Sequence, residues 1–174
     1  VVLVWGAQTS KTTTILAGLA YRIAERPCPV LWVMPSEHLA RSFTETRWLP
    51  MVEDCPALAR EKPENTDKIK ILEQHFKRCS VWWAGTSPSA LSSRSIALLC
   101  MDEVDKFPEQ AGAGREANPV QLAEARVSTY PNHLIIATST PTTADSIIWS
   151  EWLKGDMRFF FVPCPYCGLK QKLI

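Results

Sequence analysis

The chain has 174 residues, 46% of them hydrophobic and 21% charged, which predicts one folded domain and argues against disordered and fibrous classes. Lysine and arginine number 19 against 18 aspartate and glutamate, so the net charge of +1 gives no bulk signal of a nucleic-acid partner. No apolar run approaches the ~18 residues that spanning a bilayer requires, so we expect no membrane association.

The first part of the chain alternates strand-like and helix-like segments. The apolar run 1–5 predicts a strand covered on both faces, and apolar residues spaced by four predict a helix over 12–24. Residues 30–34 predict a second strand, and Ser36 is placed to cap a helix that Pro50 stops. This order is typical of the βαβ units of an α/β sheet.

The rest of the chain continues the alternation less regularly. The charge-rich segment 59–78 carries one apolar stripe and predicts a surface helix, and the apolar runs 81–84 and 96–101 predict strands. The remaining expectations are loops at 86–95 and 108–118, helices at 119–130 and 144–153, and strands at 133–137 and 159–162.

The segment after the first strand is a candidate phosphate loop, which needs a strand, a turn of exposed N–H groups and a helix that begins with Lys and Ser or Thr. Lys11 would neutralise phosphate oxygens and the Thr12 hydroxyl would ligate Mg²⁺. Trp5 and Ser10 stand where the motif has glycines, so either the serine is strained or the loop has a different conformation. The alternative is a strand–turn–helix without a ligand. The expected nucleotide-binding residues are Gly6, Ala7, Gln8, Thr9, Ser10, Lys11 and Thr12.

Polar residues follow two of the later strands. Asp102 and Glu103 end the run 96–101, and ligands of open α/β sheets bind at the carboxyl ends of strands. An aspartate there can support Mg²⁺, and the adjacent glutamate can orient and deprotonate an attacking water. Ser139 and Thr140 follow a strand in the same way, and their hydroxyls can contact phosphate. Taken singly, each pattern also fits a solvated strand end or a turn.

Cys164 and Cys167 form a CxxC followed by glycine, which can occupy two corners of a tetrahedral Zn²⁺ site. The other cysteines and the three histidines lie in distant segments, so the full-length protein would need ligands beyond this chain. The alternative is a tight turn with free thiols. Four scattered cysteines and one CxxC pair indicate reduced thiols in a cytosolic compartment rather than a disulfide framework.

Five strings together carry a resemblance to a known family. They are GAQTSKT at 6–12, GTSPSAL at 85–91, DEVDKFP at 102–108, STPT at 139–142 and PCPYCG at 163–168. The chain resembles the large terminase subunit of tailed bacteriophages, in the lambda-like GpA family. The resemblance implies an α/β P-loop NTPase of the RecA/ASCE type, a three-layer sandwich with a mostly parallel central sheet. Residues 1–158 would be the N-terminally truncated motor domain, and 159–174 the start of a linker to a C-terminal nuclease domain.

The resemblance also implies a function, an ATPase that uses Mg²⁺ to drive double-stranded viral DNA into a procapsid in the bacterial host cytoplasm. Lys11 and Glu103 would be catalytic, Thr12 and Asp102 would support the metal, and Ser139–Thr140 would couple hydrolysis to movement. The expected partners are the small terminase subunit, the portal and further copies of the chain in a ring. Since Ala7 stands where many terminases have arginine, an arginine finger must come from elsewhere; the candidates are Arg94, Arg115 and Arg126.

Two other functions remain open at the level of sequence. A helicase-like P-loop motor shares the Lys–Thr and Asp–Glu pairs, although it would need a second domain of the same kind. A nucleotide-binding or DNA-binding module that does not hydrolyse ATP would fit the degenerate phosphate loop.

Overall fold

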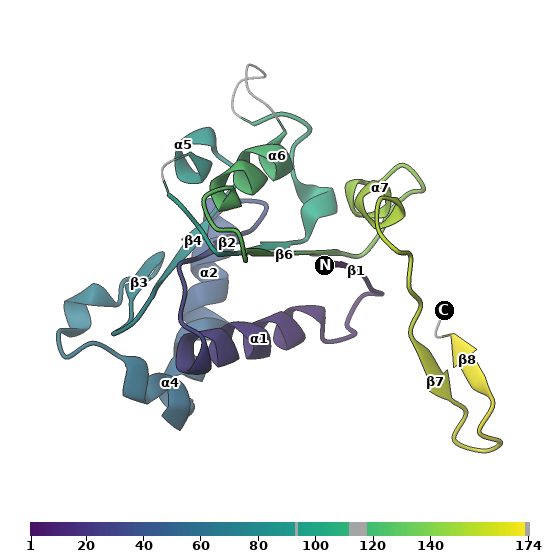
Figure 1. Ribbon diagram of the computed structural model, residues 1–174, viewed down its shortest axis with the longest axis horizontal. Coiled ribbons are helices and arrows are strands. Elements are labelled where there is room, and N and C mark those ends of the chain that lie inside the picture. Colours follow the sequence, from purple (N-terminus) through teal and green to yellow (C-terminus); the bar gives the residue numbers. More distant parts are fainter. Residues whose placement is uncertain (93, 112–117, 173–174) are drawn as a thin grey trace.

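A computed structural model describes residues 1–92, 94–111 and 118–172. Its centre is a six-stranded sheet in the order β1-β6-β5-β2-β4-β3 (Figure 1). Neighbouring strands are parallel, except that β3 runs antiparallel to β4. The strands are β1 (Val2–Val4), β2 (Val30–Val33), β3 (Glu73–His75), β4 (Ser80–Ala84), β5 (Leu98–Asp102) and β6 (Leu134–Ser139).

Helices cover both faces of this sheet, in agreement with the predicted three-layer α/β sandwich (Figure 1). The sheet faces differ because successive strand residues point to opposite sides. In β2, Val30 and Trp32 pack toward α1, while Leu31 and Val33 pack toward α6. The helices are α1 (Lys11–Glu25), α2 (Glu37–Phe43), α3 (Leu49–Asp54), α4 (Pro56–Glu61), α5 (Pro88–Leu91), α6 (Pro119–Glu124) and α7 (Ile147–Leu153).

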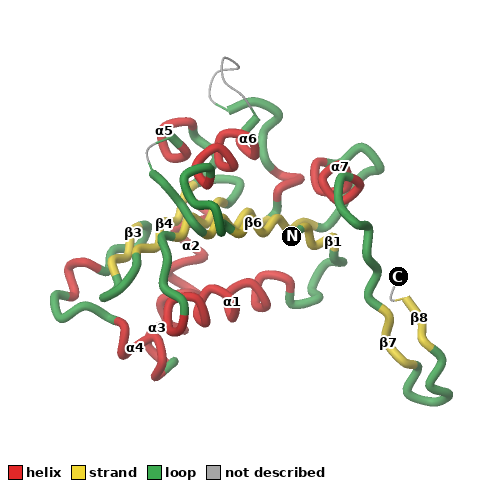
Figure 2. The backbone as a smooth tube through the Cα atoms, viewed as in Figure 1, coloured by secondary structure: helices red, strands yellow, loops and turns green. Residues whose placement is uncertain are grey.

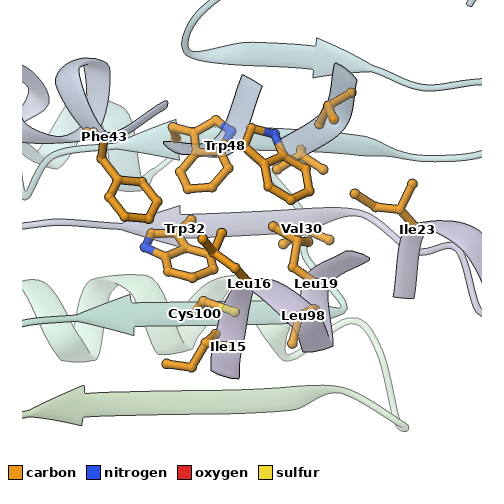
Figure 3. Close-up of a cluster of buried hydrophobic side chains, with 14 of the residues drawn as sticks. Ile15, Leu16, Leu19, Ile23, Val30, Trp32, Phe43, Trp48, Leu98 and Cys100 are labelled. Carbon is orange, nitrogen blue, oxygen red and sulfur yellow. The ribbon is translucent and has the colours of Figure 1, made fainter. Parts of the chain in front are cut away.

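The layer that contains α1 has an aromatic centre (Figure 3). The expected helical face of α1 is buried, and it packs beside Trp32 of β2. The Trp32 ring lies 5.8 Å from the Phe43 ring and 5.1 Å from the Trp83 ring, centroid to centroid, in stacked arrangements. Such aromatic pairs add to the large apolar area that these side chains remove from water. This core fixes α1, and therefore the loop before it, against the sheet.

The prediction of a helix over 59–78 is wrong. Helical structure is limited to the end of α4 and a 3₁₀ turn (Thr66–Lys68), and β3 follows and pairs with β4. The buried side chain of Gln74 explains the strand, because its Oε1 accepts hydrogen bonds from Trp48 Nε1 at 2.6 Å and Trp83 Nε1 at 3.2 Å. These partners are distant in sequence, so the apolar stripe alone could not reveal them.

Pro50 does not stop the second helix as predicted. A π-helical turn (Thr44–Trp48) connects α2 to α3, and the Leu49 N–H donates to the Thr44 carbonyl. Pro50 then falls in the first turn of α3, the part of a helix that tolerates proline. The loop predicted at 86–95 also contains the short helix α5.

The first strand is not covered on both faces as expected. β1 lies at the edge of the described sheet, pairs with β6 alone, and has half-buried residues throughout. The strand nevertheless ends level with β6, where a phosphate loop would lie, because its last residue, Val4, is in register with Ser139 of β6.

The C-terminal part of the chain forms a separate two-stranded hairpin of β7 (Phe161–Pro163) and β8 (Lys170–Lys172), which extends away from the central sheet (Figure 2). The expected strand at 159–162 is thus shifted by one or two residues. Large apolar side chains on this segment are exposed, including Phe160 at 78% and Tyr166 at 97%. Among the described residues, no helix is long and apolar enough to cross a membrane.

We expect Gly85→Ala to destabilise the protein by about 3 kcal/mol, the upper end of the range for overpacked sites. A Cβ at Gly85 would lie 2.4 Å from the Glu37 backbone nitrogen and 2.8 Å from the Ser36 carbonyl carbon, and neither atom can rotate away. Gly18→Ala is the matched control, since nothing lies within 4 Å of its added Cβ and the site is within α1. That control should gain about 0.5–1 kcal/mol in urea unfolding. Equal stability of the two variants would contradict this account.

Candidate nucleotide site

The ends of three neighbouring strands define one edge of the sheet. Because β1, β6 and β5 are adjacent and parallel, their carboxyl ends meet there. The register places Val4 beside Ser139 and Asp102 beside Thr138. The predicted phosphate loop, acidic pair and hydroxyl pair therefore converge on one edge, although they are far apart in sequence.

The loop between β1 and α1 has two non-glycine residues with left-handed backbone. Gln8 has φ 57°, and Ser10 has φ 62° and ψ 23°. Ser10 is the position at which the motif has glycine, so the expected strain is present and costs about 1–2 kcal/mol. The Thr9 hydroxyl donates to the Gly6 carbonyl at 2.7 Å, which tightens the turn. Gly6 has no positive φ, and a Cβ there would meet only Thr9 Cγ2 at 3.6 Å.

Lys11, the first residue of α1, turns its ammonium group into the site. It is only 7% exposed, and its Nζ donates to Thr140 Oγ1 at 2.8 Å and to the Gly6 carbonyl at 3.2 Å. These acceptors are neutral, so the positive charge has no anionic hydrogen-bond partner among the described residues. A buried cation beside a loop of this kind is suited to an anionic ligand.

Thr12 and Asp102 lie next to each other. The Thr12 hydroxyl donates to Asp102 Oδ2 at 2.9 Å, across 90 positions of sequence. Asp102 is 2% exposed, and burial raises the pKa of its carboxyl while the Thr12 hydrogen bond lowers it in part. Its Oδ1 is buried without a hydrogen-bond partner among the described residues. This orphaned oxygen is the donor atom that a hard cation prefers.

Glu103 adopts a left-handed backbone, with φ 59° and ψ 43°. The two adjacent carboxylates have different partners, since Asp102 accepts from Thr12 while Glu103 pairs with Lys106. Glu103 Oε2 lies 2.9 Å from Lys106 Nζ, in a pair whose side chains are 30% and 64% exposed. Because exposed pairs contribute only about 0–1 kcal/mol, this contact can open at little cost.

Ser139 and Thr140 have different contacts at the end of β6. Thr140 binds the Lys11 ammonium directly. Ser139 is fully buried, and its Oγ accepts a hydrogen bond from the Asp105 backbone N–H at 3.3 Å. The Asp105 carboxylate in turn accepts from the Ile148 N–H of α7 at 2.8 Å. Sequence reasoning missed Asp105, whose only signal was a third acidic residue in the DEVD string.

Of the candidate arginine fingers, Arg94 and Arg126 have other contacts in the part of the chain that the structure describes. The Arg94 guanidinium carbon lies 5.2 Å from the centre of the Trp82 ring. Arg126 Nη1 donates to the Ser92 carbonyl at 2.9 Å, and the Arg126 carbonyl accepts from Ile96, which precedes β5 at the opposite end from Asp102. Arg115 lies outside the described residues. An arginine finger from this chain thus stays a prediction.

Cys164 and Cys167 form the turn of the C-terminal hairpin. Backbone N–H groups of Cys167 and Tyr166 donate to the Cys164 sulfur and lower the pKa of its thiol. The Gly168 N–H donates to the Cys164 carbonyl at 2.9 Å, and Gly168 has the positive φ of 73° that closes the turn. Within the described ranges, no three histidine, cysteine or acidic side chains cluster as a metal site, so this is at most half of one.

We expect Ser10→Gly to stabilise the protein by about 0.5–1 kcal/mol. Glycine removes the left-handed strain of about 1–2 kcal/mol, and part of that gain is offset by its greater freedom in the unfolded chain. Thr9→Gly is the contrasting variant, because Thr9 has no positive φ and donates to Gly6. The thermal unfolding temperature should therefore rise for Ser10→Gly and fall for Thr9→Gly. The reverse order would show that Ser10 is not strained.

A family model described as "Phage terminase large subunit gpA, ATPase domain" matches residues 1–174. The chain belongs to this family. It is 26% identical over 180 residues to the large terminase subunit of Enterobacteria phage P21, a match that covers 98% of the chain. The chain spans 27% of the length of that relative.

Solved structures agree in fold with this gpA-type ATPase domain. The large terminase ATPase domain of Thermus phage P74-26 matches with a TM-score of 0.64 at 16% identity, over 99% of this chain and 71% of that one. The large terminase of another thermophilic bacteriophage, solved in complex with ADP, matches with a TM-score of 0.58 at 16% identity, over 86% of this chain and 35% of that one. The predicted family and fold class are therefore confirmed.

Proposed function

We propose that this terminase ATPase domain hydrolyses ATP at the edge formed by β1, β5 and β6, and that hydrolysis drives double-stranded viral DNA into a procapsid. The observation that carries the proposal is the contact of Thr12 with Asp102 beside the contact of Lys11 with Thr140. Three segments distant in sequence thus supply a cation, a hydroxyl and a carboxylate to one point. The ADP complex of the thermophilic phage terminase supports a nucleotide as the ligand.

The phosphates would bind at the loop before α1. The Lys11 ammonium, now held by two neutral oxygens, would exchange these for β- and γ-phosphate oxygens and neutralise their charge. Backbone N–H groups of the loop and the start of α1 would add further donors. Thr140, released from Lys11, is then free to contact the γ-phosphate, which links the end of β6 to the state of the nucleotide.

The residues also fit Mg²⁺. Asp102 presents a buried oxygen without a partner among the described residues, and Thr12 presents a hydroxyl that is hydrogen-bonded to the same carboxylate. Thr12 would hold the ion, with Asp102 supporting it directly or through water. When bound, Mg²⁺ supplies charge neutralisation on the phosphate oxygens. Burial raises the pKa of the Asp102 carboxyl, and a cation beside it would offset that cost of burying the charge.

Glu103 would take the proton of the attacking water. Its contact with Lys106 is the resting arrangement, and opening this exposed pair frees Glu103 Oε2 to accept the hydrogen bond of the water. The different surroundings of the two carboxylates support separate roles, since Asp102 is buried and accepts from Thr12 while Glu103 stays partly accessible.

Packaging requires more than this domain. The proposed partners are double-stranded DNA, the small terminase subunit, the portal of the procapsid and other copies of the protein in a ring, all in the bacterial host cytoplasm. An arginine finger from Arg94, Arg115 or Arg126 would act on a neighbouring copy. A nuclease elsewhere in the full-length protein would cut concatemeric DNA, as the resemblance implies.

The test is ATP turnover by the full-length protein, with and without Mg²⁺, DNA and procapsids. We expect Mg²⁺-dependent hydrolysis that DNA and procapsids stimulate together. Stimulation by DNA alone, with strand separation, would favour the helicase-like motor. No hydrolysis under any of these conditions would favour the module that binds without turnover and would overturn the proposal.

We also propose that the Cys164–Cys167 turn provides two ligands of a Zn²⁺ site in the full-length protein, the others lying outside this chain. We expect about one zinc per protein by elemental analysis. Cys164→Ser combined with Cys167→Ser should remove it, and Cys55→Ser, which alters a half-buried thiol in the ATPase core, should retain it. Zinc that survives the double substitution, or a zinc-free wild type, would refute the site.

A further inference from the structure

Asp105 is held by contacts that the proposed reaction does not explain. It lies in the short 3₁₀ turn Val104–Lys106, two residues after Glu103. Its backbone N–H donates to Ser139 Oγ, and its Oδ1 accepts from the Ile148 N–H at 2.8 Å. One residue thus joins the acidic turn, the end of β6 and the start of α7.

Asp105 is a second side-chain acceptor at the start of α7. The helix already has its own cap, because Ser146 Oγ accepts from the Trp149 N–H at 3.4 Å. Asp105 Oδ2 is moreover buried without a hydrogen-bond partner among the described residues. This half-buried carboxylate reaches from the acidic turn to α7 while its second oxygen has no described partner, which points to what Asp105 holds in place.

The element it holds is the turn that carries Glu103. A left-handed glutamate persists only where its surroundings fix it. The turn is closed by the bond from the Lys106 N–H to the Glu103 carbonyl at 2.9 Å. Asp105 gives this turn its polar attachments, to Ser139 on one side and to α7 on the other. The side chains of Val104 and Phe107 pack with Ile148 in the same apolar cluster, so apolar contacts also fix α7 against the turn.

We propose that Asp105 is a positioning residue, which holds Glu103 in its working orientation by anchoring the acidic turn to Ser139 and to the first turn of α7. The proposal rests on the proposed ATPase function and assigns no contact between Asp105 and substrate. Through Asp105, α7 is linked to the turn that carries the proposed catalytic carboxylate, Glu103. The Trp152 ring of α7 lies 5.2 Å from the Phe159 ring, edge-on, so the segment that leads into the C-terminal hairpin is connected through α7 to the proposed hydrolysis site.

The proposal is tested with Asp105→Ala and Asp105→Asn in the full-length protein. Alanine removes the anchor, and asparagine keeps an oxygen for the Ile148 N–H. We expect Asp105→Ala to lower kcat for ATP about tenfold with KM changed less than about twofold, because misplacement of Glu103 affects the chemical step and not nucleotide binding. Asp105→Asn should recover at least half of the wild-type kcat. Asp145→Ala removes an exposed carboxylate just before α7 and should match wild type.

Hydrogen exchange gives a readout that does not depend on turnover. The Ile148 amide should exchange at least tenfold faster in Asp105→Ala and at nearly the wild-type rate in Asp105→Asn. Unchanged kcat in Asp105→Ala, or equal losses in the alanine and asparagine variants, would overturn the positioning role while leaving the ATPase proposal intact. Absence of hydrolysis in the wild type would instead contradict the proposed function, and unchanged exchange at Ile148 would contradict the anchor itself.

Discussion

Glu103→Gln in the full-length protein is expected to lower kcat for ATP hydrolysis about 10³-fold, within the range for loss of a general base. The amide keeps the size and polarity of the side chain but cannot take a proton from water. Nucleotide binding should persist, because Lys11 and Thr12 are unchanged. The measurement is steady-state turnover together with the Kd of a fluorescent ATP analogue in the presence of Mg²⁺.

The control for this variant is Glu109→Gln, an exposed glutamate six positions further along the chain. It should match wild type in kcat and in Kd. If Glu103→Gln hydrolyses ATP within about threefold of the control, the catalytic carboxylate lies elsewhere. If it loses nucleotide binding as well, Glu103 contributes to the binding site rather than to the chemical step.

Asp102→Asn is expected to reduce ATPase activity about 10²-fold, a typical loss when the support of a bound metal is removed. The same substitution is expected to stabilise the metal-free protein by about 1 kcal/mol. Both effects have the same origin. The buried Asp102 carboxylate has one oxygen without a partner among the described residues, so its charge is unfavourable in the folded state until a cation binds. For a domain of this size the stability gain corresponds to a rise in Tm of about 2–4 °C.

The stability effect of Asp102 should depend on pH. Burial raises the pKa of this carboxyl in the folded state above its usual value of 3.8. As pH rises from 3.8 through the raised pKa, the unfolded chain loses this proton first, so the wild type is progressively destabilised. The stabilities of the wild type and Asp102→Asn should therefore differ least below pH 3.8. At neutral pH the asparagine variant should have its full stability advantage. The free energies of unfolding of both proteins, measured without Mg²⁺ across this pH range, test this expectation. A stability advantage of the asparagine variant that shrinks as pH rises would contradict the expected direction.

The parts of the fold that follow from local patterns were predictable from sequence. Apolar spacing of four along α1, and the apolar run that ends at Asp102, indicated the helix and the strand beside the site. Strain at Ser10 was one of two expectations for a serine in a glycine position, and its φ of 62° agrees. The family resemblance was also correct, since it rested on several strings in a fixed order.

The parts that depend on distant contacts were not predictable. The segment that contains β3 shows helical spacing of apolar residues, and only pairing with β4 and the two tryptophan N–H groups bound by Gln74 make it a strand. The bond from Lys11 to Thr140 spans 129 positions, and no local pattern marks it. The role of Asp105 is likewise visible only once β6 and α7 are in place.

The most direct measurement is a crystal structure of the full-length protein with a non-hydrolysable ATP analogue and Mg²⁺. We expect Lys11 Nζ to leave Thr140 for the β- and γ-phosphates, and Thr12 and Asp102 to face the ion. Glu103 should have left Lys106 and should lie within hydrogen-bond reach of the water opposite the γ-phosphate. A nucleotide bound elsewhere, or one bound here while Lys11 stays on Thr140, would contradict the proposed site.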